Sequence, residues 1–240
     1  MLSSREYYDA LAQNYDQELK GRSSYIEAVN ESVIQWIAAR RATTLVDVGC
    51  GNAQRLQDIL SKTGVMCTGI DESPNMVERA RGLGIDAYVM DIADVQVDKL
   101  PRATFDLVIA LWNVLGHIPG EERRRRALLN MRSLLSSGGV VLLDVNNRYN
   151  AAQYGWWRVI NNLGRDFLFG EKSGNFVIRR TVARRMIATT CRVLCLREML
   201  FMCREAGLRP IEVRFINYDT GLPASNQWSG QLLVVAESVE

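Results

Sequence analysis

The 240-residue sequence has few of the residues from which metal sites and disulfide frameworks are built. It contains a single histidine, His117, and its five cysteines form no Cys-X-X-Cys pair, whereas zinc sites need clustered cysteines and histidines. An odd number of cysteines scattered among apolar neighbours does not predict a set of disulfides. We therefore expect reduced thiols in the core, no metal site and a cytoplasmic protein.

Long apolar runs and an excess of one charge are also missing. Runs such as "LVIALW" and "VVLL" are far too short to cross a bilayer, and the polar N-terminus is not a secretory signal. The formal charge is +2, from 29 Lys and Arg against 27 Asp and Glu, so we expect neither nucleic acid nor a membrane as partner. With only 5 prolines and no Ser/Gly tract, no linker divides the chain, and we expect one domain.

The sequence does contain a regular alternation of short apolar runs and amphipathic stretches. The apolar runs lie at 44–48, 65–70, 87–90, 105–111 and 139–145. Strands of this kind, separated by helices, form a parallel sheet that helices cover on both faces. Two further strands are expected at 210–217 and 230–238, so we predict an α/β fold with a doubly wound, mostly parallel, seven-stranded sheet.

The same pattern predicts four parts within the single domain. Residues 1–42 are expected to form a helical cover and residues 43–147 the ligand-binding core. Residues 148–190, rich in aromatic and arginine side chains, are interpreted as an insertion after the fifth strand. Residues 191–240 supply the C-terminal helix and strands. Whether the insertion forms a lid or an oligomer interface stays open, as does the oligomeric state.

A glycine-rich turn follows the first strand, in "LVDVGCGNAQ". In an open α/β sheet, ligands bind at the carboxyl ends of the strands. Gly49 and Gly51 fit the start of the dinucleotide fingerprint, but Gln54 replaces its third glycine. Asp47 would disfavour a pyrophosphate at the following helix and would favour a ligand with a cationic head. Gln54 and Asp47 thus argue against a nicotinamide dehydrogenase.

Two further carboxylates follow neighbouring strands. Asp71 ends the second strand, about twenty residues after the glycines, where a carboxylate can bind ribose hydroxyls. Asp91 follows the third strand, where it can accept a hydrogen bond from an adenine amino group. Together with the glycine turn, these positions predict a nucleoside-bearing ligand.

Five segments resemble, in order and spacing, the motifs of class I S-adenosylmethionine-dependent methyltransferases: "VDVGCGNA", "GIDESPNMVERAR", "MDIAD", "FDLVIALWNVLGHI" and "LLSSGGVVLLDV". The resemblance covers residues 44–147. It implies the Rossmann-like fold of that family, S-adenosylmethionine as the cofactor and methyl transfer as the activity. This cofactor has a sulfonium and an ammonium group but no phosphate, which accounts for Asp47.

The resemblance also implies which residues contact the cofactor. Asp71 would hold the ribose, and Asp91 with Ile92 would face the adenine. Gly49 and Gly51 would let the methionine part approach. The full set implied is Tyr15, Tyr25, Asp47, Gly49, Cys50, Gly51, Asp71, Glu72, Met76, Asp91, Ile92, Leu111 and Trp112.

The methyl acceptor is indicated by the segment after the fourth strand. The Asn/Asp-Pro-Pro-aromatic motif of adenine and amide methyltransferases is absent, and residues 104–119 contain no cysteine nucleophile. "NVLGHI" instead resembles small-molecule N-methyltransferases that act on amino sugars and glycine-like amines. The resemblance implies that His117 and an N-terminal tyrosine, Tyr7 or Tyr8, meet the acceptor. His117 could also cap the next helix, and the tyrosines could be packing residues.

We therefore predict an enzyme that transfers a methyl group from S-adenosylmethionine to an amine or hydroxyl of a small metabolite by in-line displacement. The alternatives are a carboxyl or macromolecule methyltransferase, and a non-catalytic S-adenosylmethionine-binding protein. The run "RRRR" (123–126) is typical of a solvated helix face. The arginines at 179, 180, 184 and 185 could bind a phosphorylated or carboxylated substrate, and "YGWW" (154–157) could line the acceptor pocket or form the core of the insertion.

Overall fold

The computed structural model describes residues 1–15, 21–94, 100–169, 174–182 and 185–239. Its main sheet has the strand order β3-β2-β1-β4-β5-β10-β8-β9. The strands are β1 (Thr44–Val48), β2 (Met66–Asp71), β3 (Asp86–Val89), β4 (Phe105–Ala110), β5 (Leu135–Val145), β8 (Leu208–Ile216), β9 (Pro223–Ala224) and β10 (Gln231–Ser238). The first five are parallel to one another, and β10 runs antiparallel between β5 and β8.

All seven predicted strands are present, but the sheet has eight strands rather than seven. The addition is β9, which has two residues and pairs antiparallel with β8 through Phe215 with Ala224 and Ile216 with Pro223. Two residues are too few to show the apolar periodicity from which strands are predicted. The fold class is otherwise as predicted.

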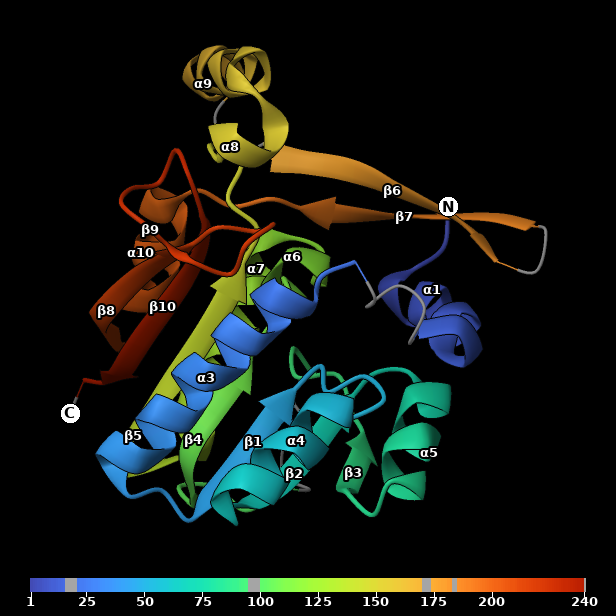
Figure 1. Cartoon of the computed structure of the whole chain (residues 1–240), viewed down its shortest axis with the longest axis vertical. Helices are drawn as coiled ribbons and strands as arrows, with labels where there is room; N and C mark the ends of the chain where they lie inside the picture. The colour runs from blue at the N-terminus through green and yellow to red at the C-terminus, as the bar shows by residue number, and fades with distance from the viewer. Residues whose placement is uncertain (16–20, 95–99, 170–173, 183–184, 240) are drawn as a thin grey trace.

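Helices cover both faces of this sheet (Figure 1). The helices on one face are α3 (Ser23–Arg40), α4 (Gln54–Thr63) and α5 (Pro74–Gly82), and those on the other are α6 (Val114–His117), α7 (Glu121–Leu134) and α10 (Leu196–Glu205). The strands are apolar on both sides because each face packs against one of these helical layers. None of the described helices is long and apolar enough to cross a bilayer.

The N-terminus and the insertion meet above the carboxyl ends of the strands. The insertion comprises α8 (Ala151–Tyr154), α9 (Trp156–Phe169) and a hairpin of β6 (Asn175–Val182) and β7 (Arg185–Arg192). The N-terminal segment contains α1 (Ser4–Leu11) and a short 3₁₀ helix, Ala12–Asn14. Leu2 donates its N–H to the carbonyl of Ala188 (2.8 Å), and Thr189 donates its hydroxyl to the carbonyl of Leu2 (3.1 Å). In Figure 1, α1 accordingly lies beneath the hairpin and α9 at the top.

Helix α9 has two contrasting sides. Its apolar side chains include Trp157 and Phe167, which are 86% and 90% exposed. Its polar side lines a large cavity with Arg158 and Arg165. Of the aromatic side chains in "YGWW", Tyr154 therefore lines the same cavity, whereas Trp156 and Trp157 are exposed.

Candidate active site

Two cavities lie at the carboxyl ends of the parallel strands, where this fold binds ligands. The smaller, of about 300 Å³, is lined by the ends of β1, β2 and β4 and by the residues after β3. The larger, of about 760 Å³, is lined mainly by the N-terminal segment and the insertion. The residues that line both are Tyr8, Tyr15, Trp112 and His117. These four side chains therefore lie where the two cavities adjoin.

The floor of the smaller cavity is the glycine turn between β1 and α4. Gly49 and Gly51 have φ angles of +72° and +56°, which disfavour any residue with a Cβ. A Cβ on Gly49 would come within 2.5 Å of Val114 Cγ2. The N–H groups of Gly49 and Cys50 both donate to the carbonyl of Ile70, at 2.8 and 3.0 Å. The main chain is therefore held against β2, and neither glycine projects a side chain into the cavity.

Asp71 is held in a fixed orientation at one side of this cavity. Its carboxylate accepts hydrogen bonds from the N–H groups of Gly51 and Ser73, both at 2.9 Å. Burial raises the pKa of Asp71, although these two hydrogen bonds oppose the rise. Glu72 lines the cavity beside it, and burial raises the pKa of Glu72 as well. Each carboxylate keeps lone pairs for further donors, as ribose binding requires.

Asp91 and Ile92 also line the smaller cavity, on its other side. Asp91 accepts a hydrogen bond from the N–H of Ala93 (2.8 Å) and forms an ion pair with Arg123. Arg123 belongs to the run 123–126, and it lines the cavity. Its neighbour Arg124 is buried and donates to the carbonyl of Ile118 at 3.0 Å. The prediction of a solvated arginine face is therefore wrong for Arg124, which is buried, whereas the side chain of Arg123 stays 34% exposed.

A pair of opposite charges is buried beside the glycine turn. The Nε atom of Arg55 lies 3.4 Å from Oδ2 of Asp47, and its guanidinium lies 4.7 Å from the ring centroid of Trp112. Burial raises the pKa of Asp47 to about 6, and Arg55 opposes the rise. Both Asp47 oxygens and two Arg55 nitrogens have no hydrogen-bond partner among the described residues. Arg55 lines the cavity and Asp47 lies behind it.

The sequence analysis did not single out Arg55. A long cationic side chain in the first turn of the helix that follows the glycine turn was the available signal. The residue was overlooked because a charged side chain at a helix start is ordinarily exposed, whereas Arg55 is only 6% exposed.

Tyr8 and His117 form a hydrogen-bonded pair where the two cavities meet. The Tyr8 hydroxyl lies 2.9 Å from Nε2 of His117, and the rings are edge-to-face with centroids 5.1 Å apart. Burial lowers the pKa of His117 to about 4, so the imidazole is neutral near pH 7. Its Nδ1 atom is buried and has no partner among the described residues. The alternative of a cap on α7 is excluded, since Gly120 is the N-cap residue there and no side chain caps that helix.

The other tyrosines have different surroundings. Tyr15 lines both cavities, and burial raises its pKa to about 12. Tyr7 is buried and lines only the larger cavity. Tyr25 lines neither of them, because its hydroxyl donates to Asp144 at 2.5 Å beside a separate small cavity of about 40 Å³. The structure thus brings Tyr15, but not Tyr25, to the predicted cofactor site.

Of four more residues that were predicted to contact the cofactor, two line the smaller cavity and two do not. Leu111 and Trp112 line the smaller cavity. The side chains of Cys50 and Met76 are buried in the core instead. A Cβ on Gly69 would lie 2.8 Å from the Cys50 sulfur, which places that thiol against β2. The alternation of side chains around the glycine turn therefore leaves only the main chain of Cys50 near the cavity.

Comparison with known proteins identifies the core of the chain. A family model described as a methyltransferase domain matches residues 46–141. That range contains the glycine turn, Asp71, Asp91 and His117, and it lies within the Rossmann-like core of the sheet. Residues 46–141 of the chain therefore match a methyltransferase domain. The cofactor of this domain is S-adenosylmethionine.

The names of the relatives indicate that those proteins act on different methyl acceptors. A ubiquinone biosynthesis O-methyltransferase from Xanthomonas axonopodis pv. citri is 28% identical over 159 residues, 62% of this chain and 63% of that protein. A glycine/sarcosine/dimethylglycine N-methyltransferase from Actinopolyspora halophila is 24% identical over 59% of this chain and 26% of that protein. The chain thus matches less than two thirds of the length of either relative.

Solved methyltransferase structures share the fold over nearly the whole chain. The sugar N-methyltransferase KedS8 from Streptoalloteichus superposes with a TM-score of 0.61 at 22% identity, covering 94% of this chain and 93% of that one. The structural similarity therefore extends well beyond residues 46–141.

The residues of the smaller cavity fit S-adenosylmethionine. Among the described lining residues the only cations are Arg55 and Arg123, and each already faces a carboxylate, Asp47 or Asp91. A phosphate would find no uncompensated cation there, whereas a ligand with cationic centres and no phosphate meets no repulsion. The unpartnered buried atoms of Asp47 and Arg55 match the ammonium and carboxylate of a methionine group.

Proposed function

We propose that the chain transfers the methyl group of S-adenosylmethionine to an amine or hydroxyl of a small metabolite. One observation carries the proposal: a cavity that fits the cofactor meets a second, larger cavity at Tyr8, Tyr15, Trp112 and His117. Methyl transfer needs this arrangement, because the acceptor atom must approach the sulfonium in line and in the absence of bulk water. The names of the relatives, which include O- and N-methyltransferases of small molecules, support the same conclusion.

In the smaller cavity, which we call the cofactor cavity, each part of the cofactor has a residue to bind it. Asp71 binds the ribose hydroxyls, with its carboxylate held by Gly51 and Ser73. Asp91 and Ile92 face the adenine. Arg55 binds the methionine carboxylate, and the negative charge of Asp47 behind it favours the ammonium group.

The larger cavity, which we call the acceptor cavity, holds the nucleophile. The bound cofactor supplies an electrophilic methyl group on sulfur, and the chain's task is to orient the acceptor atom toward it. His117 is neutral because burial lowers its pKa to about 4. A neutral imidazole paired with the Tyr8 hydroxyl can accept a hydrogen bond from an acceptor N–H or O–H. Tyr8 and His117 thus direct the lone pair of the acceptor atom toward the methyl group.

The structure also bears on the alternatives. A binding protein without catalysis would not need a second cavity of about 760 Å³ that shares four lining residues with the cofactor cavity. This observation favours an enzyme over a non-catalytic binding protein.

Formation of S-adenosylhomocysteine from S-adenosylmethionine in the presence of a panel of small amines and hydroxyl compounds tests the proposal. Thermal unfolding of the same protein with S-adenosylhomocysteine or NAD provides the binding control, because a ligand of the native state raises the melting temperature. We expect stabilisation by S-adenosylhomocysteine alone and turnover with at least one compound. Stabilisation without turnover, on small molecules, protein or RNA, would instead identify a non-catalytic binding protein.

A further inference from the structure

In the part of the chain that the structure describes, the charged side chains around the acceptor cavity are all positive. Six arginines line it, namely Arg22, Arg148, Arg158, Arg165, Arg179 and Arg180, and no aspartate or glutamate is among its described lining residues. The whole chain has nearly equal numbers of positive and negative residues. Composition therefore does not account for the imbalance, which arises because the insertion directs arginines to this one cavity.

One of these arginines is already neutralised by the protein. Arg148 is buried and forms ion pairs with Asp166 (2.7 Å) and Glu198 (2.5 Å). The guanidinium of Arg22 lies 5.6 Å from the ring centroid of Tyr218, a contact that holds the side chain without removing its charge.

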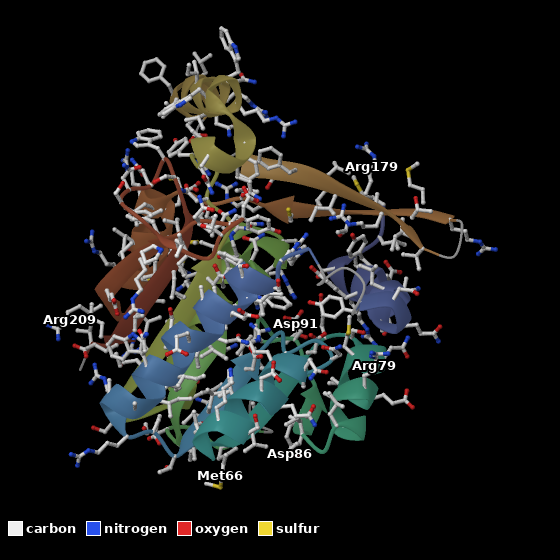
Figure 2. All side chains as sticks on the ribbon, viewed as in Figure 1. Met66, Arg79, Asp86, Asp91, Arg179 and Arg209 are labelled. Atoms are coloured by element: carbon white, nitrogen blue, oxygen red, sulfur yellow. The ribbon has the colours of Figure 1, made fainter. Side chains whose placement is uncertain are left out.

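Three others are not neutralised. Arg158 and Arg165 lie two turns apart on the polar side of α9, and Arg179 lies on β6. Their side chains are exposed at the outer part of the cavity, and Figure 2 shows Arg179 on the hairpin. None of the three has an ion-pair or hydrogen-bond partner among the described residues. Like charges gathered without a counter-charge repel one another, and a bound anion would relieve that repulsion.

Arg158 and Arg165 lie at a different end of the acceptor cavity from the reacting groups. Tyr8 belongs to α1, which lies beneath the β6–β7 hairpin that carries Arg179, whereas α9 lies at the top of the molecule (Figure 1). Both helices line the same cavity of about 760 Å³. A ligand that fills this cavity can therefore contact His117 with one group and the arginines of α9 with another.

We propose that the methyl acceptor carries an anionic group, a phosphate or a carboxylate, which Arg158, Arg165 and Arg179 bind. Guanidinium groups bind both anions through paired, charge-assisted hydrogen bonds. The inference rests on the proposed function, since it concerns the acceptor cavity of the same enzyme. The methyl-accepting amine or hydroxyl then belongs to the opposite end of an anionic metabolite.

Isothermal titration calorimetry of the protein saturated with S-adenosylhomocysteine tests this site without requiring turnover. The probes are inorganic pyrophosphate for a phosphate group, citrate for carboxylates and glucose as a neutral control. We expect one or both anions to bind, with an affinity that falls as salt is added, and glucose not to bind. Pyrophosphate alone would indicate a phosphorylated acceptor, and citrate alone a carboxylated one.

The matched variants are a triple substitution of Arg158, Arg165 and Arg179 by Ala, and a control triple substitution of Arg197, Arg204 and Arg209 by Ala. The control removes the same charge from exposed residues that do not line the acceptor cavity. We expect the first variant to weaken anion binding by about tenfold or more for each arginine lost and the control to leave it within about twofold. S-adenosylhomocysteine affinity serves as the test of folding and should be unchanged in both.

Three results would overturn the inference: no binding of either anion, equal weakening in the two variants, or binding of a transfer RNA that pyrophosphate does not displace. Failure of the proposed function looks different. There, S-adenosylhomocysteine would fail to bind, or the anions would bind while no acceptor yielded product.

Discussion

Tyr8 and His117 are the residues on which the proposed chemistry depends most directly. Their hydrogen bond of 2.9 Å joins the N-terminal helix to the end of α6, at the junction of the two cavities. Burial lowers the pKa of His117 to about 4, below the ordinary value for histidine, which makes it a neutral hydrogen-bond partner that orients the acceptor.

Replacing His117 with Asn should lower turnover by about a hundredfold, because the imidazole that orients the acceptor atom toward the methyl group is lost. Affinity for S-adenosylhomocysteine should stay within about threefold, because Asp71 and the glycine turn are untouched. Tyr8→Phe is the companion variant, and it should lower turnover less. The measurements are turnover, cofactor affinity and melting temperature on each protein. If stability falls while the rate per folded molecule is retained, His117 has only a packing role.

Asp71→Asn tests the ribose assignment. The substitution keeps the size of the side chain but removes the charge that accepts hydrogen bonds from Gly51, Ser73 and the ribose. Cofactor binding should weaken by roughly 1–3 kcal/mol, measured by titration calorimetry. Asp94→Asn is the control, because Asp94 is exposed and does not line the cofactor cavity. Equal dissociation constants for wild type and Asp71→Asn would place the ribose elsewhere.

Among the elements, the β6–β7 hairpin has the largest influence on the site. It lies far from the glycine turn in sequence, yet Thr189 and Thr190 line the cofactor cavity and Arg179 the acceptor cavity. Two hydrogen bonds attach the N-terminal segment to β7 through Leu2. The position of Tyr8 therefore depends on the insertion as well as on α1 itself.

Thr189→Val tests this dependence. The substitution preserves the shape of the side chain and removes its hydrogen bond to the carbonyl of Leu2. We expect a loss of about 1 kcal/mol in the attachment of the N-terminal segment, seen as a raised KM for the acceptor and faster amide hydrogen exchange in α1. Thr63→Val, which removes a hydroxyl bonded to the carbonyl of Ile59 at the end of α4, is the control. The idea fails if the two variants change the exchange of α1 equally.

Across the whole molecule, stability depends on carboxylates buried under the carboxyl end of the sheet. Burial raises the pKa of Asp47 and the pKa of Asp144 to about 6 in each case. Between the unfolded value near 4 and the folded value near 6, the folded protein binds more protons than the unfolded chain. These two groups therefore make the cofactor-free protein less stable as pH rises through this range.

Comparison of the wild type with Asp47→Asn isolates the contribution of Asp47 to this pH dependence. The asparagine does not titrate, so the free energy of unfolding of the variant should rise relative to the wild type between pH 4 and pH 6, by up to about 1.4 kcal/mol per pH unit. Urea unfolding at several pH values, without cofactor, measures the difference. A difference that stays constant with pH would mean that Asp47 titrates alike in the folded and unfolded states.

The strands of the sheet, their order along the chain and the cofactor-facing turn could all be predicted from the amino-acid sequence. Each of these follows from local patterns: apolar runs of strand length, glycines that accept positive φ at residues 49 and 51, and an acid at the end of β2. The tertiary structure decided what depends on contacts between distant segments. It placed Tyr8 against His117, turned Tyr25 toward Asp144 and Arg123 toward Asp91, and buried Arg55 beside Asp47. The one-sided charge of the acceptor cavity belongs to this second group, because its arginines come from α9 and β6, whose positions are set only when the insertion folds over the core.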